Sequence, residues 1–159
     1  MATQKFDDID LQILRELQQN GRMTNVELAQ VVGLTAPPCL RRVRALEEAG
    51  VIRSYHADLD PGKLGYGITV FAMVSLRSQA ENDLKAFEDY IGTLAEVREC
   101  YMLNGEIDFL LKVVARDLQS FQSFLTHHLT SAPNVTSVKT SLTIRTAKQL
   151  AGIPVEEDE

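Results

Sequence analysis

The sequence predicts an α+β chain: a winged helix-turn-helix in residues 1–60, followed by a β-α-β-β-α-β sandwich of the ferredoxin-like type in residues 67–150. Residues 24–50 have the apolar spacing and end signals of two short helices joined by a tight turn. From residue 67 the apolar pattern changes between the periods of strands and helices. Asp-Pro-Gly at 60–62 interrupts the pattern, which places a linker at 61–66 and leaves an acidic tail at 151–159.

The first two helices are bounded by residues that favour helix ends. Asp7 is expected to cap a helix of about 8–19, which Asn-Gly at 20–21 ends. Thr24 and Glu27 have the spacing of a capping box, in which each side chain bonds the other residue's backbone N–H. A second helix is therefore predicted to begin directly after Thr24.

The third helix is predicted from the residues before it and in its first turn. Gly33 supplies a left-handed stop for the second helix, and Thr35 is expected to cap the third. Pro37 and Pro38 fit the first turn, where a missing N–H costs nothing. Residues 51–59 then alternate between apolar and polar side chains like a strand. Three helices followed by one strand indicate a winged helix of which only half the wing is visible in the sequence.

The third helix has an apolar side and a basic side. Its inward positions are expected to be Ala36, Cys39, Leu40, Val43 and Leu46. Arg41 lies near the centre of the opposite side, with Arg42 and Arg44 flanking it. A central arginine can reach guanine O6 and N7, whereas flanking arginines are better placed for phosphates. The candidate DNA-binding residues are Thr24, Thr35, Pro37, Pro38, Arg41, Arg42 and Arg44. The alternative is that these arginines form an ordinary solvated surface, and the complete set of start and stop signals of both helices disfavours it.

The charge of the chain bears on how it can bind DNA. Sixteen Lys and Arg stand against 22 Asp and Glu, which gives a net charge of −6. Neutralisation of phosphates drives much of DNA affinity, so a monomer should bind weakly. Dimerisation would place two basic patches on one duplex, and this interpretation therefore requires it.

The second part contains six segments in order. Strands are expected at 68–76, 97–103, 107–115 and 135–144, with both faces of the first at least partly covered. One helix carries Leu84, Phe87 and Ile91, and another follows Asp117 and ends before Pro133. Asn-Gly at 104–105 predicts a tight hairpin between the second and third strands. The end of the tail, residues 156–159, is expected to fray.

Several classes of protein find no support in the sequence. No apolar run approaches the ~18 residues of a membrane span, and no signal segment begins the chain, so we expect a cytoplasmic protein without a membrane partner. Cys39 and Cys100 lack metal-ligand spacing and are expected to be free, buried thiols. His127 and His128 would diverge by about 100° on a helix, so we expect no metal site. No catalytic motif occurs, and we expect neither catalytic residues nor a cofactor.

Three segments carry a specific resemblance: NGRMTNVELA at 20–29, GLTAPPCLRRVRALEEAGVI at 33–52 and GEIDFLLKVV at 105–114. From Asp7 to about Leu150 the chain resembles the Lrp/AsnC family of transcription regulators, and residues 38–44 resemble its leucine-responsive branch. The resemblance implies a helix-turn-helix joined to an α/β sandwich whose sheets form a dimer. It also implies dimers that assemble to an octamer and wrap DNA in the nucleoid, with a free amino acid as effector between dimers.

The same resemblance implies an effector site. The family's Gly-x-x-Asp hairpin corresponds here to Gly105 and Asp108, whose turn amides could hold a carboxylate and whose carboxylate could hold an α-ammonium. Around it, Tyr101, Met102 and Leu103 could shape the side-chain pocket, and a neighbouring dimer would contribute Val135, Thr136, Ser137 and Val138. The alternative is that the glycine serves only the turn and Asp108 only bonds turn amides.

Two functions from different classes remain open at this point. One is a sequence-specific regulator of operator DNA whose homo-oligomer responds to an amino acid. The other is an architectural, nucleoid-type protein that wraps DNA without an effector, with a steep salt dependence and little discrimination between sites.

Overall fold

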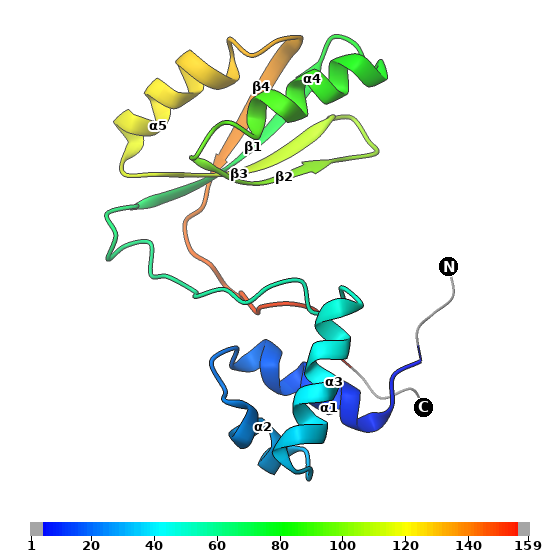
Figure 1. Ribbon diagram of the computed structural model, residues 1–159. Coiled ribbons are helices and arrows are strands. Elements are labelled where there is room, and N and C mark those ends of the chain that lie inside the picture. Colours follow the sequence, from blue (N-terminus) through cyan, green and yellow to red (C-terminus); the bar gives the residue numbers. More distant parts are fainter. Residues whose placement is uncertain (1–4, 156–159) are drawn as a thin grey trace. The chain divides into compact units, whose positions relative to one another are not determined.

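The computed structural model describes residues 5–155, and the contacts of the chain divide it into two compact units (Figure 1). The helical unit comprises Met1–Asp58 with Lys148–Glu159, and the sandwich unit comprises Leu59–Ala147. The part of the tail expected to fray, 156–159, lies outside the described residues. Within the described residues, no helix is long and apolar enough to cross a membrane.

The helical unit contains the three predicted helices, α1 (Asp8–Gln19), α2 (Asn25–Val31) and α3 (Ala36–Glu48). Both predicted caps of the first two helices form, and each is a complete capping box. The helices bury one apolar cluster, which consists of Ile13, Leu28, Ala29, Val32, Cys39 and Leu46. This cluster fixes the side of α3 that faces inward and therefore the side that faces solvent.

The start of α3 departs from the prediction in one detail. Gly33 is left-handed as expected, with φ of 71°. Thr35 occupies the N-cap position, yet its side chain accepts no capping hydrogen bond. A capping oxygen accepts from the second or third helical residue, and here those residues are Pro37 and Pro38, which have no N–H. The expected cap is therefore wrong, and the hydroxyl of Thr35 is left for another partner.

The strand predicted at 51–59 is wrong, since no strand occurs there in the described structure. A strand needs a neighbour to satisfy its backbone, and the unit offers none. Val51 and Ile52 instead pack against the helical core. Tyr55 lies against Gly21 and donates its hydroxyl to Glu47 Oε1 at 2.8 Å.

Residues 152–155 pack on α1 within the helical unit. The side-chain amide of Gln18 pairs with the backbone of Ile153, donating to its carbonyl at 2.6 Å and accepting from its N–H at 3.2 Å. Arg15 Nε donates to the carbonyl of Val155 at 3.1 Å. Gly152 has φ of +72°, and a Cβ at this position would collide with Gln18. A glycine is thus required where the tail meets the helix.

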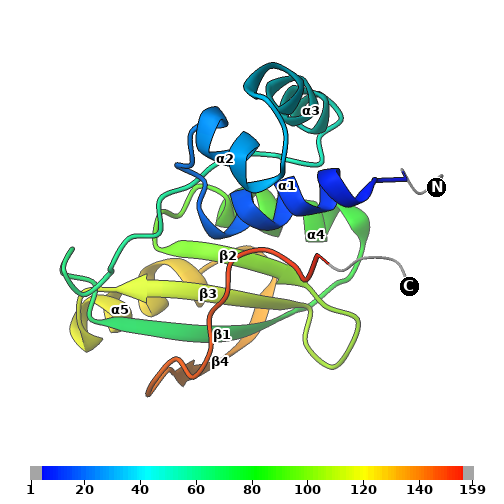
Figure 2. The same ribbon diagram turned by 90° about the horizontal axis from the view of Figure 1, so that it is seen from below.

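The sandwich unit has the predicted β-α-β-β-α-β order. Its elements are β1 (Ile68–Leu76), α4 (Glu81–Ile91), β2 (Val97–Met102), β3 (Phe109–Ala115), α5 (Leu118–Phe124), the π-helical turn η1 (Leu125–Leu129) and β4 (Val135–Leu142). The strands form one sheet in the order β2-β3-β1-β4, and all its pairs are antiparallel. Figures 1 and 2 show α4 and α5 on the same face of this sheet.

The two faces of the sheet differ in burial. Side chains of β1 that point toward the helices, from Val70 to Leu76 at every second position, are buried in the main core. The opposite side, here called the open face, carries Thr69, Phe71, Met73, Leu110, Lys112 and Val114, as the strand register shows. Phe71 on this face is 37% exposed. The expected partial cover of both faces holds, but the open face has no layer of its own within the described chain.

The connection between β2 and β3 is longer than the predicted tight hairpin. Six residues, 103–108, separate the strands, and Gly105 is not among the glycines with positive φ. The loop is closed by the N–H of Leu103, which donates to the carbonyl of Asp108 at 2.8 Å. Asp108 is in turn tied to β1, because its N–H donates to the carbonyl of Val74 at 3.0 Å. The conformation of this loop is therefore determined by its hydrogen bond to β1 and not by a local Asn-Gly turn.

Candidate DNA-binding surface and effector site

The solvent side of α3 forms a shallow groove along the helix. It is lined by Pro37, Leu40, Arg41, Arg44, Ala45 and Glu48. These positions recur at the spacing of one helical face, opposite the buried Cys39 and Leu46. Arg41 lies on this face, as the sequence predicted, and Arg44 shares it.

The two arginines of the groove are unpaired. Within residues 5–155, neither Arg41 nor Arg44 takes part in a hydrogen bond or an ion pair, and both are exposed. An exposed guanidinium without a carboxylate partner keeps all its donors available for an anion. The groove therefore presents two cations, with Glu48 as the one carboxylate that lines it.

Arg42 has a different position from the one expected. Its Nη1 lies 2.7 Å from Asp7 Oδ2 and 2.7 Å from Asp10 Oδ1, so that it ties α3 to the start of α1. These hydrogen bonds raise the pKa of Arg42 further above its ordinary value, with the bond to Asp10 contributing most. The expectation that Arg42 flanks Arg41 for phosphate contact is corrected, because about 100° of helical rotation turns it toward α1.

Leu40 is the second correction on α3. It was expected to face inward, but its side chain is 37% exposed and lines the groove. Cys39 is fully buried and Val43 contacts the core, as expected, whereas Cys100 on β2, which was also expected to be buried, is exposed. Leu40 therefore lies at the edge of the groove, beside Arg41.

The remaining candidates of this surface have distinct positions. The hydroxyl of Thr24 is used within its capping box, accepting from the N–H of Glu27 at 3.2 Å and donating to its carboxylate at 2.8 Å. Thr35 is exposed and without a cap bond. Pro37 lines the groove, whereas Pro38 is half-buried and does not.

The two predicted parts of the effector site flank the same end of β1. The loop 103–108 precedes β3, and the start of β4 carries Val135 to Val138. Val74, near the end of β1, pairs with Phe109 on one side and Val138 on the other. Figure 1 shows the loop at the end of the sheet where β1 leads into α4. The fold thus brings both segments to one end of the sheet, on either side of one strand.

Asp108 has a structural position at this end of the sheet. It is only 7% exposed, and its Oδ2 accepts from the N–H of Leu76 at 2.6 Å. Its Oδ1 accepts from Gln79 Nε2 at 2.8 Å. Both carboxylate oxygens are thus engaged within the chain, which disagrees with the expected grip on an α-ammonium. No local sequence signal marks Gln79, because the contact joins residues 29 positions apart.

The backbone of the same loop remains available. Within the described structure, the N–H groups of residues 104–107 donate no hydrogen bond, and residues 104–106 are exposed. Successive free amides in a turn can hold an anion such as a carboxylate. The loop therefore has free N–H donors of the kind that the predicted carboxylate contact requires.

The side chains around the loop do not all share one pocket. Tyr101 pairs in register with Leu110 of the open face and donates its hydroxyl to Glu99 at 2.7 Å, which raises the pKa of Tyr101. Met102 pairs with Phe109 and lines a hollow between β2 and α4. In β4, Val135 and Val138 contact the core, whereas Thr136 and Ser137 are exposed. Leu103 is 39% exposed at the start of the loop.

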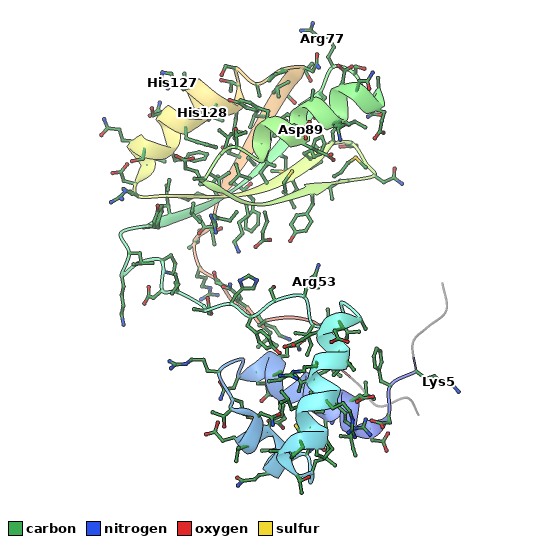
Figure 3. The ribbon with its side chains drawn as sticks, viewed as in Figure 1. Lys5, Arg53, Arg77, Asp89, His127 and His128 are labelled. Atoms are coloured by element: carbon green, nitrogen blue, oxygen red, sulfur yellow. The ribbon has the colours of Figure 1, made fainter. Side chains whose placement is uncertain are left out.

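The histidines show no arrangement for metal. Figure 3 shows His127 and His128 on the segment after α5. His127 Nδ1 lies 2.8 Å from the carbonyl of Ser123, and the ring of His128 stacks on Phe124 at 5.4 Å between centroids. No group of three or more His, Cys, Asp or Glu in the described part of the chain could hold a metal ion.

Comparison with known proteins identifies both units. Residues 6–53 match the family model of the winged helix-turn-helix DNA-binding domain, and residues 69–153 match that of the Lrp/AsnC ligand binding domain. The leucine-responsive regulatory protein of Rhizobium meliloti (strain 1021) is 52% identical over 151 residues, which cover 95% of this chain and 97% of that protein. The leucine-responsive regulatory protein of Escherichia coli (strain K12) is 38% identical, covering 91% of this chain and 88% of that protein.

A solved structure agrees over almost the whole chain. It is that of a transcriptional regulator from Neisseria meningitidis in complex with L-methionine. Its TM-score is 0.90 at 37% identity, and the match covers 94% of this chain and 97% of that chain. The two units of this chain thus occur together in a protein that binds an amino acid.

Proposed function

The chain belongs to the Lrp/AsnC family of DNA-binding transcription regulators, which are not enzymes, and from that premise we propose that α3 reads operator DNA while the sandwich unit binds a free amino acid. The observation that carries the proposal for DNA is the groove on α3 with two unpaired arginines. The recognition helix of a helix-turn-helix lies in the major groove, so this face is the one that meets base edges.

The roles of the groove residues follow from their positions. Arg41 donates to guanine O6 and N7, and Arg44 contacts a phosphate on the same face. The hydroxyl of Thr35 makes no capping hydrogen bond, and it donates to a neighbouring phosphate. Arg42 holds α3 against α1 and contributes indirectly, by fixing the angle of the recognition helix.

Assembly increases the number of basic patches that meet one DNA duplex. With a net charge of −6, a single chain gains little from phosphate neutralisation. We propose a homodimer through the open face, where Phe71, Met73 and Leu110 lie on the side of the sheet opposite α4 and α5. Further assembly of dimers to an octamer follows the family's pattern and would repeat the α3 groove along one duplex in the cytoplasmic nucleoid.

The amino acid is held at the end of β1. Its carboxylate accepts from the free amides of the loop 103–108, and its side chain contacts Leu103 and Tyr101. Thr136 and Ser137, exposed at the start of β4, approach the ligand from a neighbouring dimer. The L-methionine complex of the Neisseria meningitidis relative supports an amino acid as the ligand class.

The ligand can act on DNA binding through assembly. A ligand that contacts two dimers binds the assembled state more tightly than the separate dimers, and therefore shifts their populations. Since operator half-sites are read by several chains together, the assembly state sets the affinity and the spacing of sites.

Thermal unfolding of the full chain with each of the twenty amino acids tests this proposal. A ligand at ~100 times its dissociation constant stabilises by about 2.7 kcal/mol, which raises the melting temperature by several degrees. An upward shift with one amino acid or a related group supports the sensor. No shift with any amino acid, together with DNA binding of low sequence discrimination, would favour an architectural protein without an effector.

A further inference from the structure

We propose that Leu40 contacts the 5-methyl group of a thymine next to the base that Arg41 reads. The inference rests on the proposed reading of DNA by α3 and adds a specificity-determining residue to it. Its starting point is the exposed position of an aliphatic side chain in a groove that also holds two unpaired cations.

Leu40 presents part of an apolar side chain on the solvent side of α3. The side chain is 37% exposed, whereas Cys39, its neighbour on the helix, is fully buried. A single exposed leucine is common on protein surfaces, so its exposure alone indicates no partner. What distinguishes Leu40 is its place in the groove, directly beside Arg41.

The surroundings of Leu40 indicate the chemistry of that partner. Arg41 and Arg44 line the same groove and select an anion, while Pro37 and Ala45 give the groove further apolar surface. A partner must therefore combine negative charge with an apolar group at its surface. The major groove of DNA has this combination, because phosphates border it and thymine is the base that projects a methyl group into it.

The geometry places the two contacts on neighbouring bases. Leu40 and Arg41 are consecutive on the helix and both line the groove, so their side chains diverge yet remain on the solvent side of α3. The guanidinium of Arg41 can hydrogen-bond guanine while the side chain of Leu40 contacts the thymine methyl group of the adjacent base pair. Burial of one methyl group corresponds to about a fourfold change in affinity for each half-site.

The test removes the methyl group alone. The full chain is used to select duplexes from a random pool, and the best duplex is made again with deoxyuridine in place of thymine at one position at a time. Pairing with adenine is unchanged, so each duplex differs from its parent by one methyl group. Binding is measured by fluorescence anisotropy at constant salt with the parent chain, Leu40→Ala and Val31→Ala. Val31 is the control because it is an aliphatic residue 45% exposed at the end of α2 and does not line the groove.

The expected result is a position at which uracil weakens binding about fourfold for the parent and for Val31→Ala. Because a dimer meets two half-sites, Leu40→Ala should bind the thymine duplex at least as weakly as the parent binds the duplex with one uracil, and it should not distinguish thymine from uracil at that position. Equal affinity of the parent for thymine and uracil at every position overturns the inference while leaving the reading of DNA by Arg41 intact. Loss of uracil sensitivity in Val31→Ala would overturn it as well. Failure to select any sequence would contradict the proposed function itself.

Discussion

Replacement of Asp108 distinguishes a structural carboxylate from a ligand-binding one. In the structure both of its oxygens are occupied, by the N–H of Leu76 at 2.6 Å and by Gln79 Nε2 at 2.8 Å. Asp108→Ala leaves the N–H of Leu76 without an acceptor at the buried end of β1. Asp108→Asn retains an oxygen for that N–H, and Gln79 can rotate its amide to accept from the new NH₂ group.

The expected magnitudes follow from these two contacts. A buried donor without an acceptor costs about 1–3 kcal/mol, and loss of the bond to Gln79 adds about 1 kcal/mol, so Asp108→Ala should destabilise the sandwich unit by roughly 2–4 kcal/mol. Asp108→Asn should cost less than about 1 kcal/mol. Glu106→Ala is the matched control, because Glu106 is exposed in the same loop.

Hydrogen exchange combined with urea unfolding measures the effect. The amide of Leu76 should lose its protection in Asp108→Ala and retain it in Asp108→Asn and Glu106→Ala. Under this structural role, Asp108→Asn also keeps the thermal shift caused by the amino acid. The reasoning is refuted if Asn is as destabilising as Ala, or if Asn keeps full stability but loses the ligand response, since the charge would then serve the ligand.

Three further predictions concern the helical unit. Arg41→Ala should lose ~1–3 kcal/mol of binding free energy on the best duplex and should discriminate less between sequences. Arg44→Ala should weaken binding to all duplexes alike and reduce the slope of log affinity against log salt by about 1. Identical behaviour of the two variants in salt-dependent anisotropy titrations would contradict these roles. Gly152→Val should release the tail from Gln18, because valine disfavours the positive φ at this position and its Cβ would collide with Gln18. Hydrogen exchange of residues 150–155 should then become faster, while that of α3 stays unchanged. Burial and a hydrogen bond to a carboxylate raise the pKa of Tyr55 from 10.0 to about 12. The protonated hydroxyl therefore stabilises the folded state fully below pH 10.0, and this contribution is lost as the pH rises toward 12. An alkaline titration followed by tyrosinate absorbance should therefore show late ionisation to which Tyr55 contributes, and Tyr55→Phe should reduce its amplitude by one tyrosine. An unchanged titration in Tyr55→Phe would contradict the prediction.

Local signals in the sequence predict the elements of both units. Asp7 and Thr24 begin their helices through capping boxes that need only residues three positions apart. The alternation of β1 likewise identifies the side that the helices bury. These features are predictable because each depends on a few neighbouring residues.

The cap of Thr35 fails for a local reason, the prolines that follow it, but the departures at the candidate sites involve partners distant in the sequence. The helical wheel places Leu40 near the border of two faces, and the packing of α1 and α2 decides on which side it falls. The ion pair of Arg42 with Asp7 joins residues 35 positions apart, and the bond of Asp108 to Leu76 joins residues 32 apart. No periodicity or cap encodes such contacts, so the candidate sites could be located by sequence but not assigned residue by residue.

The central claim is that occupancy of the sandwich unit changes how α3 binds DNA. The most direct measurement titrates the selected duplex with the full chain, at constant salt, with and without the amino acid that raises the melting temperature. We expect a change in apparent affinity of about 5- to 150-fold, in either direction, and the same factor when the ligand is titrated with and without the duplex. Superimposable isotherms at saturating amino acid would contradict this coupling, because they would show that the two units bind their ligands independently.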